Sequence, residues 1–312
     1  RDPREGAMTR TAAAGAPAAA ALAWLPAVFV LIWSTGFVVA RFGMPHAPPM
    51  SFLSVRYALS VVCFGVWVWL AHAAWPREPR QWLHLAVSGV LMHAGYLGGV
   101  WSAVKLGIGA GTVSLLVGLQ PVLTALWLAN SARGTGRPQV LAREWMGLLL
   151  GLLGLTLVLS GKFSIGEVTP RNLALALVAL FSITAGTLYQ KRFVAPCDVR
   201  TANSVQLLAA LAVSLPFAWL ETEPMHWHPQ LIGALLWSVL VLTLGGSSLL
   251  YLLIQRGAAT RVTSLLYLVP PCTALLAWLL FGESFTTTML LGLVLTVAGV
   301  AMVVRAPAAA SK

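Results

Sequence analysis

The sequence predicts an all-α integral membrane protein with ten transmembrane helices, arranged as two inverted repeats of five helices each. Three observations predict this fold: the composition, the spacing of the apolar segments and a weak internal repeat. Of the 312 residues, 58% are hydrophobic and only 9% are charged, and the mean hydropathy is +0.83. A soluble domain carries about 25% charged residues. This chain therefore lacks the polar residues needed to cover a surface that faces water.

Ten apolar segments are long enough to cross a bilayer, which takes about 20 helical residues. Prolines and glycines in the stretches between the segments end the helices. The first five segments run near 24–42, 50–71, 82–104, 111–130 and 143–160. The second five run near 172–190, 202–220, 229–254, 263–281 and 287–304. Residues 24–160 thus form the first five-helix repeat and residues 161–306 the second.

The two ends of the chain are expected to lie outside this fold. Arg1–Ala7 looks like an expression scar ahead of a natural start at Met8, and the alanine-rich residues 12–23 look like a disordered lead-in. A cleaved signal peptide is the alternative for residues 1–23, but this stretch is a poor apolar core for one. Residues 307–312 form a short C-terminal tail.

A weak repeat relates the two halves at a constant separation of 150 residues. Gly107 matches Gly257, Pro121 matches Pro271, and the Ser-Leu-Leu sequence at 114–116 recurs at 264–266. Because each half has five spans, an odd number, the second half enters the membrane in the opposite orientation to the first. Inverted duplication of this kind is typical of secondary transporters.

Glycines in the fifth and tenth segments extend the repeat. Gly147 and Gly154 have the same seven-residue spacing as Gly292 and Gly299, and Gly151 lies between the first two. A spacing of seven places two residues on one face of a helix, and small residues there let helices approach closely. We expect this glycine face to pack against a neighbouring helix.

The positive charges predict the orientation. The formal net charge of +11 would suggest nucleic-acid binding in a soluble protein, but here the topology explains it and no nucleic-acid partner is expected. If both termini are cytoplasmic, most basic residues fall inside, as the positive-inside rule requires. The basic residues placed inside are Arg77, Arg80, Arg133, Arg137, Arg143, Lys191, Arg192, Arg200, Arg256, Arg261, Arg305 and Lys312. The loops placed outside contain only Arg41, Lys105, Lys162 and Arg171.

Several short stretches resemble the EamA branch of the drug/metabolite transporter superfamily. They are Trp33–Phe37, Arg56–Tyr57, Ala110–Pro121, Gly186–Arg192 and Gly282–Ser284. The resemblance covers about residues 24 to 305. One departure is that Asn130–Arg133 stands where the first half of family members usually carries a Gly-Glu pair.

The resemblance implies ten helices in two inverted halves, a bacterial inner-membrane location and transport of small metabolites. Within the family, the chain looks most like the YddG-type exporters of amino acids. Two complete halves in one chain would make a monomer sufficient for transport.

The substrate site of such a transporter lies near the membrane midplane, between the repeats. His93 is the one ionisable side chain that the predicted spans place at this depth. It is either a group that responds to protons or touches substrate, or a neutral histidine bonded to a neighbouring helix. Gln120 is a second polar candidate. Four aromatic residues could line the pocket, although each taken alone fits an interface belt better: Trp33, Tyr96, Trp101 and Tyr267.

Proline interrupts the fourth and ninth spans at equivalent positions. Pro121 in one span and Pro270 and Pro271 in the other lack the amide proton and clash with the preceding turn, so each helix should kink. The kinks expose polar backbone groups that could border the pathway. Arg56 lies near the outer end of the second span, and we expect it to extend towards the headgroups rather than meet a substrate carboxylate.

Some classes of function are excluded or disfavoured. No Asp or Glu lies inside a predicted span, so the carboxylate relay of proton-coupled drug export is missing. This favours facilitated transport or coupling through His93. The chain has no phosphate-binding loop with Gly-Lys-Ser/Thr, and its three cysteines lack metal spacing. We therefore expect no ATP drive, cofactor or metal.

The preferred function is export of aromatic or other neutral amino acids by alternating access. The main alternative is export of organic cations, drugs or other small metabolites. A remote alternative is an intramembrane serine hydrolase that uses Ser247 or Ser248 with His93, but no carboxylate is placed to orient the histidine. A passive channel is disfavoured because no span carries an even polar stripe.

Overall fold

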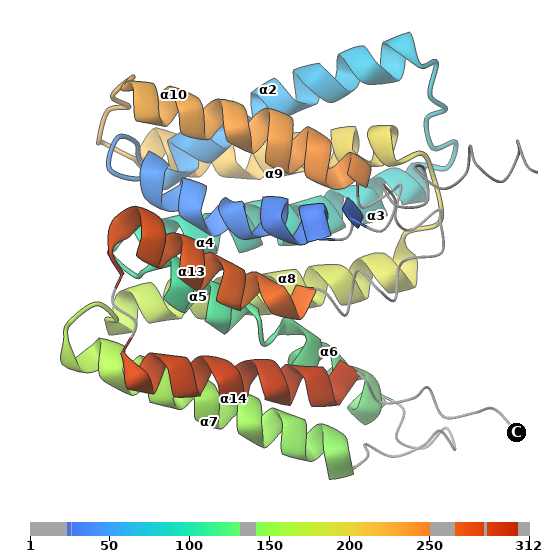
Figure 1. The fold of residues 1–312 in the computed structure, drawn as a ribbon. Coiled ribbons are helices and arrows are strands. Elements are labelled where there is room, and N and C mark those ends of the chain that lie inside the picture. Colours follow the sequence, from blue (N-terminus) through green and yellow to red (C-terminus); the bar gives the residue numbers. More distant parts are fainter. Residues whose placement is uncertain (1–23, 26, 132–141, 250–265, 284–285, 305–312) are drawn as a thin grey trace, which may run out of the picture.

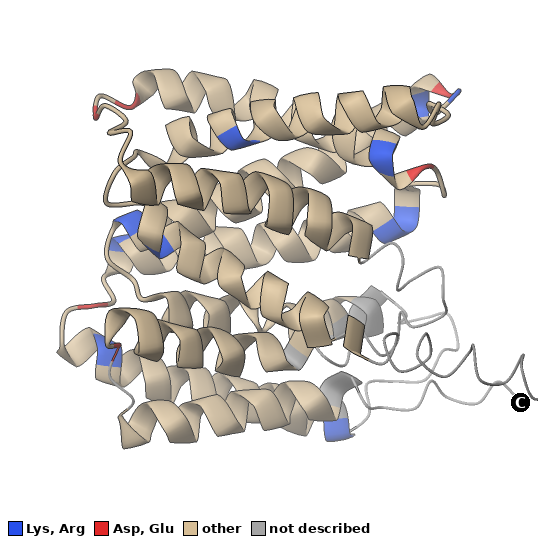
Figure 2. Ribbon diagram, turned by 45° about the horizontal axis from the view of Figure 1, so that its top comes forward, with Lys and Arg blue, Asp and Glu red and all other residues tan. Residues whose placement is uncertain are grey.

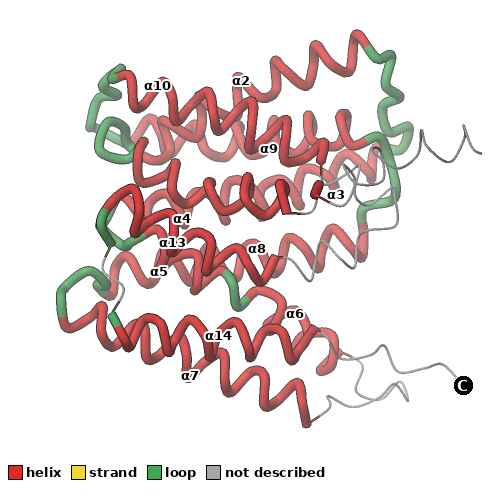
Figure 3. The backbone as a smooth tube through the Cα atoms, in the orientation of Figure 1, coloured by secondary structure: helices red, strands yellow, loops and turns green. Residues whose placement is uncertain are grey.

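The structure is a computed structural model that describes residues 24–25, 27–131, 142–249, 266–283 and 286–304. Its regular structure is helical throughout, and no strand occurs among the described residues (Figure 3). The predicted all-α class is therefore confirmed for this part of the chain. The expected lead-in 1–23, the tail 307–312 and the second copy of the repeat around Gly257 lie outside the described residues.

Six of the described helices, with consecutive helical segments counted together, are long and apolar enough to cross a bilayer. They are Pro49–Leu70, Pro79–Lys105, Trp145–Ser164, Pro170–Phe193, Val199–Leu220 and Pro229–Leu249. Four shorter apolar helices are Ala27–Gly43, Ala110–Thr124, Val269–Phe281 and Thr287–Met302. The protein is therefore a multi-pass membrane protein.

The elements run side by side in a bundle (Figure 1). After the first helix, Ala27–Gly43, the first half contains α2 (Pro49–Leu70), α3 (Pro79–Gly89), η1 (Val90–Gly95), α4 (Tyr96–Lys105), α5 (Ala110–Val117), α6 (Gln120–Ser131) and α7 (Ala142–Ser164). The second half contains α8 (Pro170–Phe193), α9 (Val199–Leu220), α10 (Pro229–Leu236), η2 (Trp237–Gly245), η3 (Leu266–Leu268), α13 (Val269–Phe281) and α14 (Thr287–Val304).

Proline determines where many of these helices begin. It occupies the first turn of α2, α3, α8, α10 and α13, where its missing N–H has no intrahelical partner to lose and its fixed φ suits the helix. The predicted bounds of α2, α8, α9 and α14 lie within three residues of the observed ones. The observed end of α7, Ser164, lies four residues beyond the predicted end of the fifth span at 160.

Helices from the two halves of the sequence pack on each other: α7 on α14, α2 on α9, and α5 on α13. The pair α7 and α14 forms one edge of the bundle (Figure 1). A Cβ atom built on Gly154 would lie 2.5 Å from the carbonyl oxygen of Gly292, and Gly299 lies against Gly147 and Gly151. The expected close packing of the glycine face is confirmed, and its neighbour is the matching glycine face of the other half.

Charged residues gather near the two ends of the bundle, and its middle is almost free of them (Figure 2). At one end, three ion pairs join loops and helix ends, and two of the pairs link residues that are distant in sequence. They are Arg41–Glu283 at 2.7 Å, Lys105–Glu223 at 2.6 Å and Lys162–Glu167 at 2.6 Å. Glu167 accepts a hydrogen bond from the backbone N–H of Gly109, the N-cap residue of α5. Glu283 accepts one from the backbone N–H of Ala110, the first residue of α5.

Asp198 caps the N-terminus of α9 at the other end of the bundle. Because its carboxylate is ionised in the cap, the free energy of unfolding should depend on pH. Its carboxylate accepts bonds from the backbone N–H and the guanidinium of Arg200, and the bond from the Arg200 side chain holds the pKa of this carboxyl below its ordinary value. A lowered pKa stabilises the fold above the unfolded value and loses that effect as pH falls through the folded value. We expect Asp198→Ala to lower the free energy of unfolding by about 1 kcal/mol at pH 7.

The measurement is the melting temperature in detergent from pH 7 downwards. The deficit of Asp198→Ala should shrink as pH falls below about 4, the ordinary pKa of an aspartate, and through the lower pKa of the folded carboxyl. Asp198→Asn is the matched variant, because its side-chain oxygen can still cap the helix without the charge. A deficit of Asp198→Ala that stays constant with pH would show that the carboxylate charge contributes nothing.

Candidate functional site

A cavity in the interior of the bundle has two adjoining chambers. One has a volume of about 120 Å³ and the other about 260 Å³. Both are lined by Trp33, Phe37, Met92, Tyr96 and Ile183. We call the smaller one the arginine chamber, which is also lined by Arg56, His93, Trp101 and Thr243. The larger one, the proline chamber, is also lined by Gln120, Pro121, Thr187 and Pro270.

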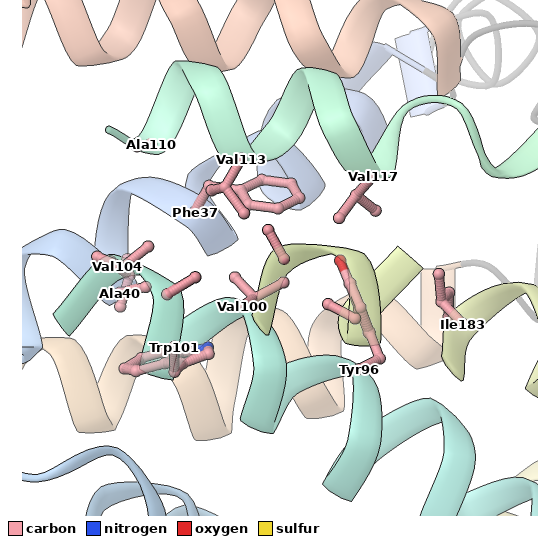
Figure 4. Packing of buried hydrophobic residues seen from close by; sticks show 14 of the residues in the cluster. Phe37, Ala40, Tyr96, Val100, Trp101, Val104, Ala110, Val113, Val117 and Ile183 are labelled. Carbon is pink, nitrogen blue, oxygen red and sulfur yellow. The ribbon is translucent and has the colours of Figure 1, made fainter. Parts of the chain in front are cut away.

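The walls come from helices of both halves of the sequence. Figure 4 shows the packed cluster beside the cavity, to which the first helix contributes Phe37, α5 contributes Val113, and α4 contributes Tyr96 and Val100. Ile183 of α8 lies beyond Tyr96 in the same view. The lining is mostly apolar, so the few polar groups in it determine which chemistry the cavity can accept.

Arg56 is the charged group of the arginine chamber. It is only 7% exposed, and its Nε and Nη2 atoms donate to Oγ1 of Thr243 at 3.3 Å and 3.1 Å. Its guanidinium carbon lies 6.0 Å from the ring centre of Trp101, within reach of a cation–π interaction. No carboxylate lies within ion-pair distance of Arg56 in the part of the chain that the structure describes.

The expectation that Arg56 extends to the headgroups is wrong. The residue shares one face of α2 with Phe52, Leu53 and Ser60, all of which are buried in the bundle. Residues three and four positions apart lie on the same side of a helix, so the packing of this face carries Arg56 inwards.

His93 lies on η1, a π-helical segment between α3 and α4. Its backbone oxygen accepts a hydrogen bond of 2.9 Å from the Tyr57 hydroxyl, and its side chain bonds with Gln206 of α9. The residue thus lines the chamber and also bonds to neighbouring helices. Both interpretations offered by the sequence remain compatible with this position, and its role stays a prediction.

A second π-helical segment, η2, faces the same chamber. It carries Thr243, which stands 150 residues after His93 and belongs to the sequence-equivalent span. Oγ1 of Thr243 donates to the backbone oxygen of Ser238, so it is held in place to accept from Arg56. Single π-helical turns are frequent at functional sites, and here two of them meet at one chamber.

The predicted aromatic residues fall into two groups. Trp33 and Tyr96 line both chambers, and Trp101 lines the arginine chamber and stacks on Phe52 with ring centres 4.4 Å apart. The side chain of Tyr267 lies outside the described residues, although its backbone belongs to η3.

The predicted interruptions at the prolines occur, but as breaks rather than bends. The break between α5 and α6 lies at Gly118–Leu119, and Pro121 occupies the first turn of α6. Pro270 and Pro271 lie in the first turn of α13, after the short helix η3. The two breaks meet, because a Cβ atom built on Gly118 would lie 2.9 Å from Cγ of Pro270. Pro271 alone of the three prolines does not line the cavity.

Gln120 lies at the break and lines the proline chamber. Its side-chain amide donates to Oγ1 of Thr187 on α8 at 2.9 Å. Neither Thr187 as a site residue nor the inward direction of Arg56 was predicted from the sequence. The small and polar residues Ser54, Ser60 and Thr187, placed on otherwise apolar helices, were the available signal for faces that look into the bundle.

Comparison with known proteins now decides the family. The sequence matches the EamA-like transporter family over residues 20–160 and again over residues 171–305. The chain belongs to this family. Family membership indicates a membrane transporter rather than an enzyme.

Relatives of known name are distant but cover almost the whole chain. The chain is 27% identical to the "Probable amino-acid metabolite efflux pump" of Salmonella typhimurium, over 88% of this chain and 92% of that protein. It is 27% identical to an "Uncharacterized inner membrane transporter" of Escherichia coli, over 88% and 87%. It is 25% identical to an "Uncharacterized transporter" of Archaeoglobus fulgidus, over 88% and 94%.

A solved crystal structure shares the fold. It superposes with a TM-score of 0.62 at 19% identity and covers 89% of this chain and 94% of the other. At this identity the likeness supports the arrangement of the helices and nothing about the substrate.

Proposed function

We propose that this EamA-family protein is a secondary transporter of the bacterial inner membrane that exports neutral or aromatic amino acids by alternating access. The observation that carries the proposal is the interior cavity, whose apolar and aromatic walls come from both halves of the chain. A cavity at the interface of two halves is where transporters built from repeats bind substrate. The similarity to the "Probable amino-acid metabolite efflux pump" of Salmonella typhimurium, which extends over most of both chains, supports amino acids as the substrate class.

We propose further that the fold has ten spans in two inverted halves. Under a two-fold axis, a contact from residue i of one half to residue j of the other is repeated between their equivalents. Gly147 is equivalent to Gly292, and Gly154 is equivalent to Gly299. Gly154 contacts Gly292, and the equivalent pair, Gly299 and Gly147, is also in contact. The paired π-helical segments and paired breaks give the same support. The excess of Lys and Arg at one end supports cytoplasmic termini.

The competing substrates are organic cations, drugs or other small metabolites. The decisive experiment is transport by the purified protein in liposomes, with labelled L-leucine and L-phenylalanine, with and without a pH gradient. We expect uptake of at least one of the two above that of empty liposomes. Failure of every amino acid tested, alongside transport of an organic cation, would contradict the proposed substrate class.

His93 is the residue through which we expect transport to depend on protons. Replacing it with alanine removes the only histidine among the described residues that line the cavity, so any pH dependence of the transport rate should disappear. His84 is the matched control, because it bonds with Tyr189 at 2.8 Å and does not line the cavity. A pH profile that His93→Ala leaves unchanged would remove His93 from the mechanism.

A further inference from the structure

We propose that Arg56 of the arginine chamber is the binding site for the carboxylate of the transported molecule. Substrates would then be zwitterionic or acidic metabolites, and organic cations would be rejected. This inference rests on the proposed function and specifies its substrate class. It starts from one feature of the structure, a buried guanidinium that faces a cavity and has no anionic partner among the described residues.

The bonds that Arg56 makes leave most of its donors unused. A guanidinium has five N–H donors in a planar fork. In the structure, Nε and Nη2 both donate to the same atom, Oγ1 of Thr243, and Nη1 has no partner in the described part of the chain. A neutral hydroxyl cannot compensate a charge, and a buried charge without a counterion is strongly unfavourable. An anion that enters the chamber would supply both the charge and the missing acceptors.

The groups around Arg56 favour an anion of limited size with an apolar or aromatic side chain attached. The other titratable side chains at the chamber, His93 and Tyr96, supply no fixed negative charge. No carboxylate lines either chamber among the described residues. Trp33, Val100 and Leu242 provide apolar surface beside the guanidinium. A carboxylate matches the planar fork in a bidentate manner, and the rest of a small metabolite can rest on these apolar walls.

The same charges disfavour a cation. An organic cation would stand beside an uncompensated guanidinium in a low-dielectric space, where repulsion between like charges is strong. Aromatic faces can attract an ammonium group. They can therefore hold the amine of a zwitterion once its carboxylate has neutralised Arg56.

The experiment compares molecules that differ only in the carboxylate. Purified full-length protein is tested for thermal stabilisation and for liposome uptake with L-leucine, L-leucinamide and 3-methylbutylamine, and the same set is repeated for phenylalanine. We expect stabilisation and uptake by the acids and not by the amides or amines. Arg56→Gln should weaken the apparent affinity for the acids by about 30-fold or more. Arg56→Lys should restore part of the loss, because it keeps the charge without the fork.

Control variants separate binding from folding. Arg192→Gln removes an exposed arginine at the end of α8 and should leave affinity unchanged. The circular dichroism and unliganded melting temperature of each Arg56 variant show whether it folds. If Arg56→Gln does not fold, the wild-type preference for acid over amide is the deciding measurement.

Each outcome separates this inference from the proposed function. Equal transport of leucine and leucinamide would overturn the carboxylate site but leave an amino-acid transporter. Acids that stabilise the protein without being transported would support the site and contradict the transport assignment. Stabilisation by inorganic phosphate but by no acid would overturn the carboxylate assignment. Stabilisation by none of the acids would overturn the inference as a whole.

Discussion

Gly154→Ala is expected to destabilise the protein strongly, because the added methyl group falls on the backbone of α14. A Cβ atom at this position would lie 2.5 Å from the carbonyl oxygen of Gly292 and 2.5 Å from Oγ1 of Thr296. The Gly292 oxygen belongs to backbone, and Thr296 is held by its own bond of 2.8 Å to that oxygen. Neither can move without separating α7 from α14. We expect a loss of about 3 kcal/mol, seen as a lower melting temperature and yield of folded protein in detergent.

The matched control is the same change on α2. Gly65 is exposed, and a Cβ atom there would meet no atom within 4 Å. Alanine favours the helix over glycine by about 0.5–1 kcal/mol, so Gly65→Ala should be neutral or stabilising. If Gly154→Ala melts at or above the wild-type temperature, the close approach of α7 and α14 contributes nothing to stability.

The glycine face also shows what the sequence could predict. The seven-residue spacing of Gly147 and Gly154 specified a face and its close packing, since helical periodicity is a local property. It did not specify the partner. The partner is the glycine face of α14. It could be predicted only by assuming that a two-fold axis relates the two halves.

Helix bounds and interruptions differ in how far sequence predicts them. Proline at helix starts placed the ends of α2 and α8 to within three residues. The π-helical segments η1 and η2 were not predicted from the sequence. The signal that was present is Gly95 and Gly245, which end the two segments 150 residues apart.

Several residues that line the cavity were named from the sequence, but their arrangement in it was not. Trp33, His93, Tyr96 and Trp101 line the cavity, and their role in binding substrate stays a prediction. The direction of Arg56 was wrong because depth along a helix was considered without its face. The buried neighbours Leu53 and Ser60 lie three and four residues away, and they decide that Arg56 points inwards.

Glu283→Ala is expected to destabilise the protein clearly. The carboxylate is nearly buried, with a side-chain exposure of 5%, and pairs with Arg41 at 2.7 Å. It also accepts a bond from the backbone N–H of Ala110 at 3.1 Å, the first residue of α5. A carboxylate at a helix N-terminus is favoured by the helix dipole. Bonds to a charged group contribute about 1.5–3 kcal/mol. We expect Glu283→Ala to lower the free energy of unfolding by about 2–3 kcal/mol.

Glu223 offers a control with almost the same ion-pair geometry and a different environment. Its pair with Lys105 is 2.6 Å long, but its side chain is 45% exposed, and such pairs contribute about 0–1 kcal/mol. Glu223→Ala should therefore shift the melting temperature little, while Glu283→Ala shifts it clearly. Because Glu283 joins the first helix, α5 and the end of α13, its loss should also loosen this end of the bundle. Faster hydrogen exchange of the first α5 amides in Glu283→Ala alone is the expected sign, and equal exchange in the two variants would show that the carboxylate does not hold α5.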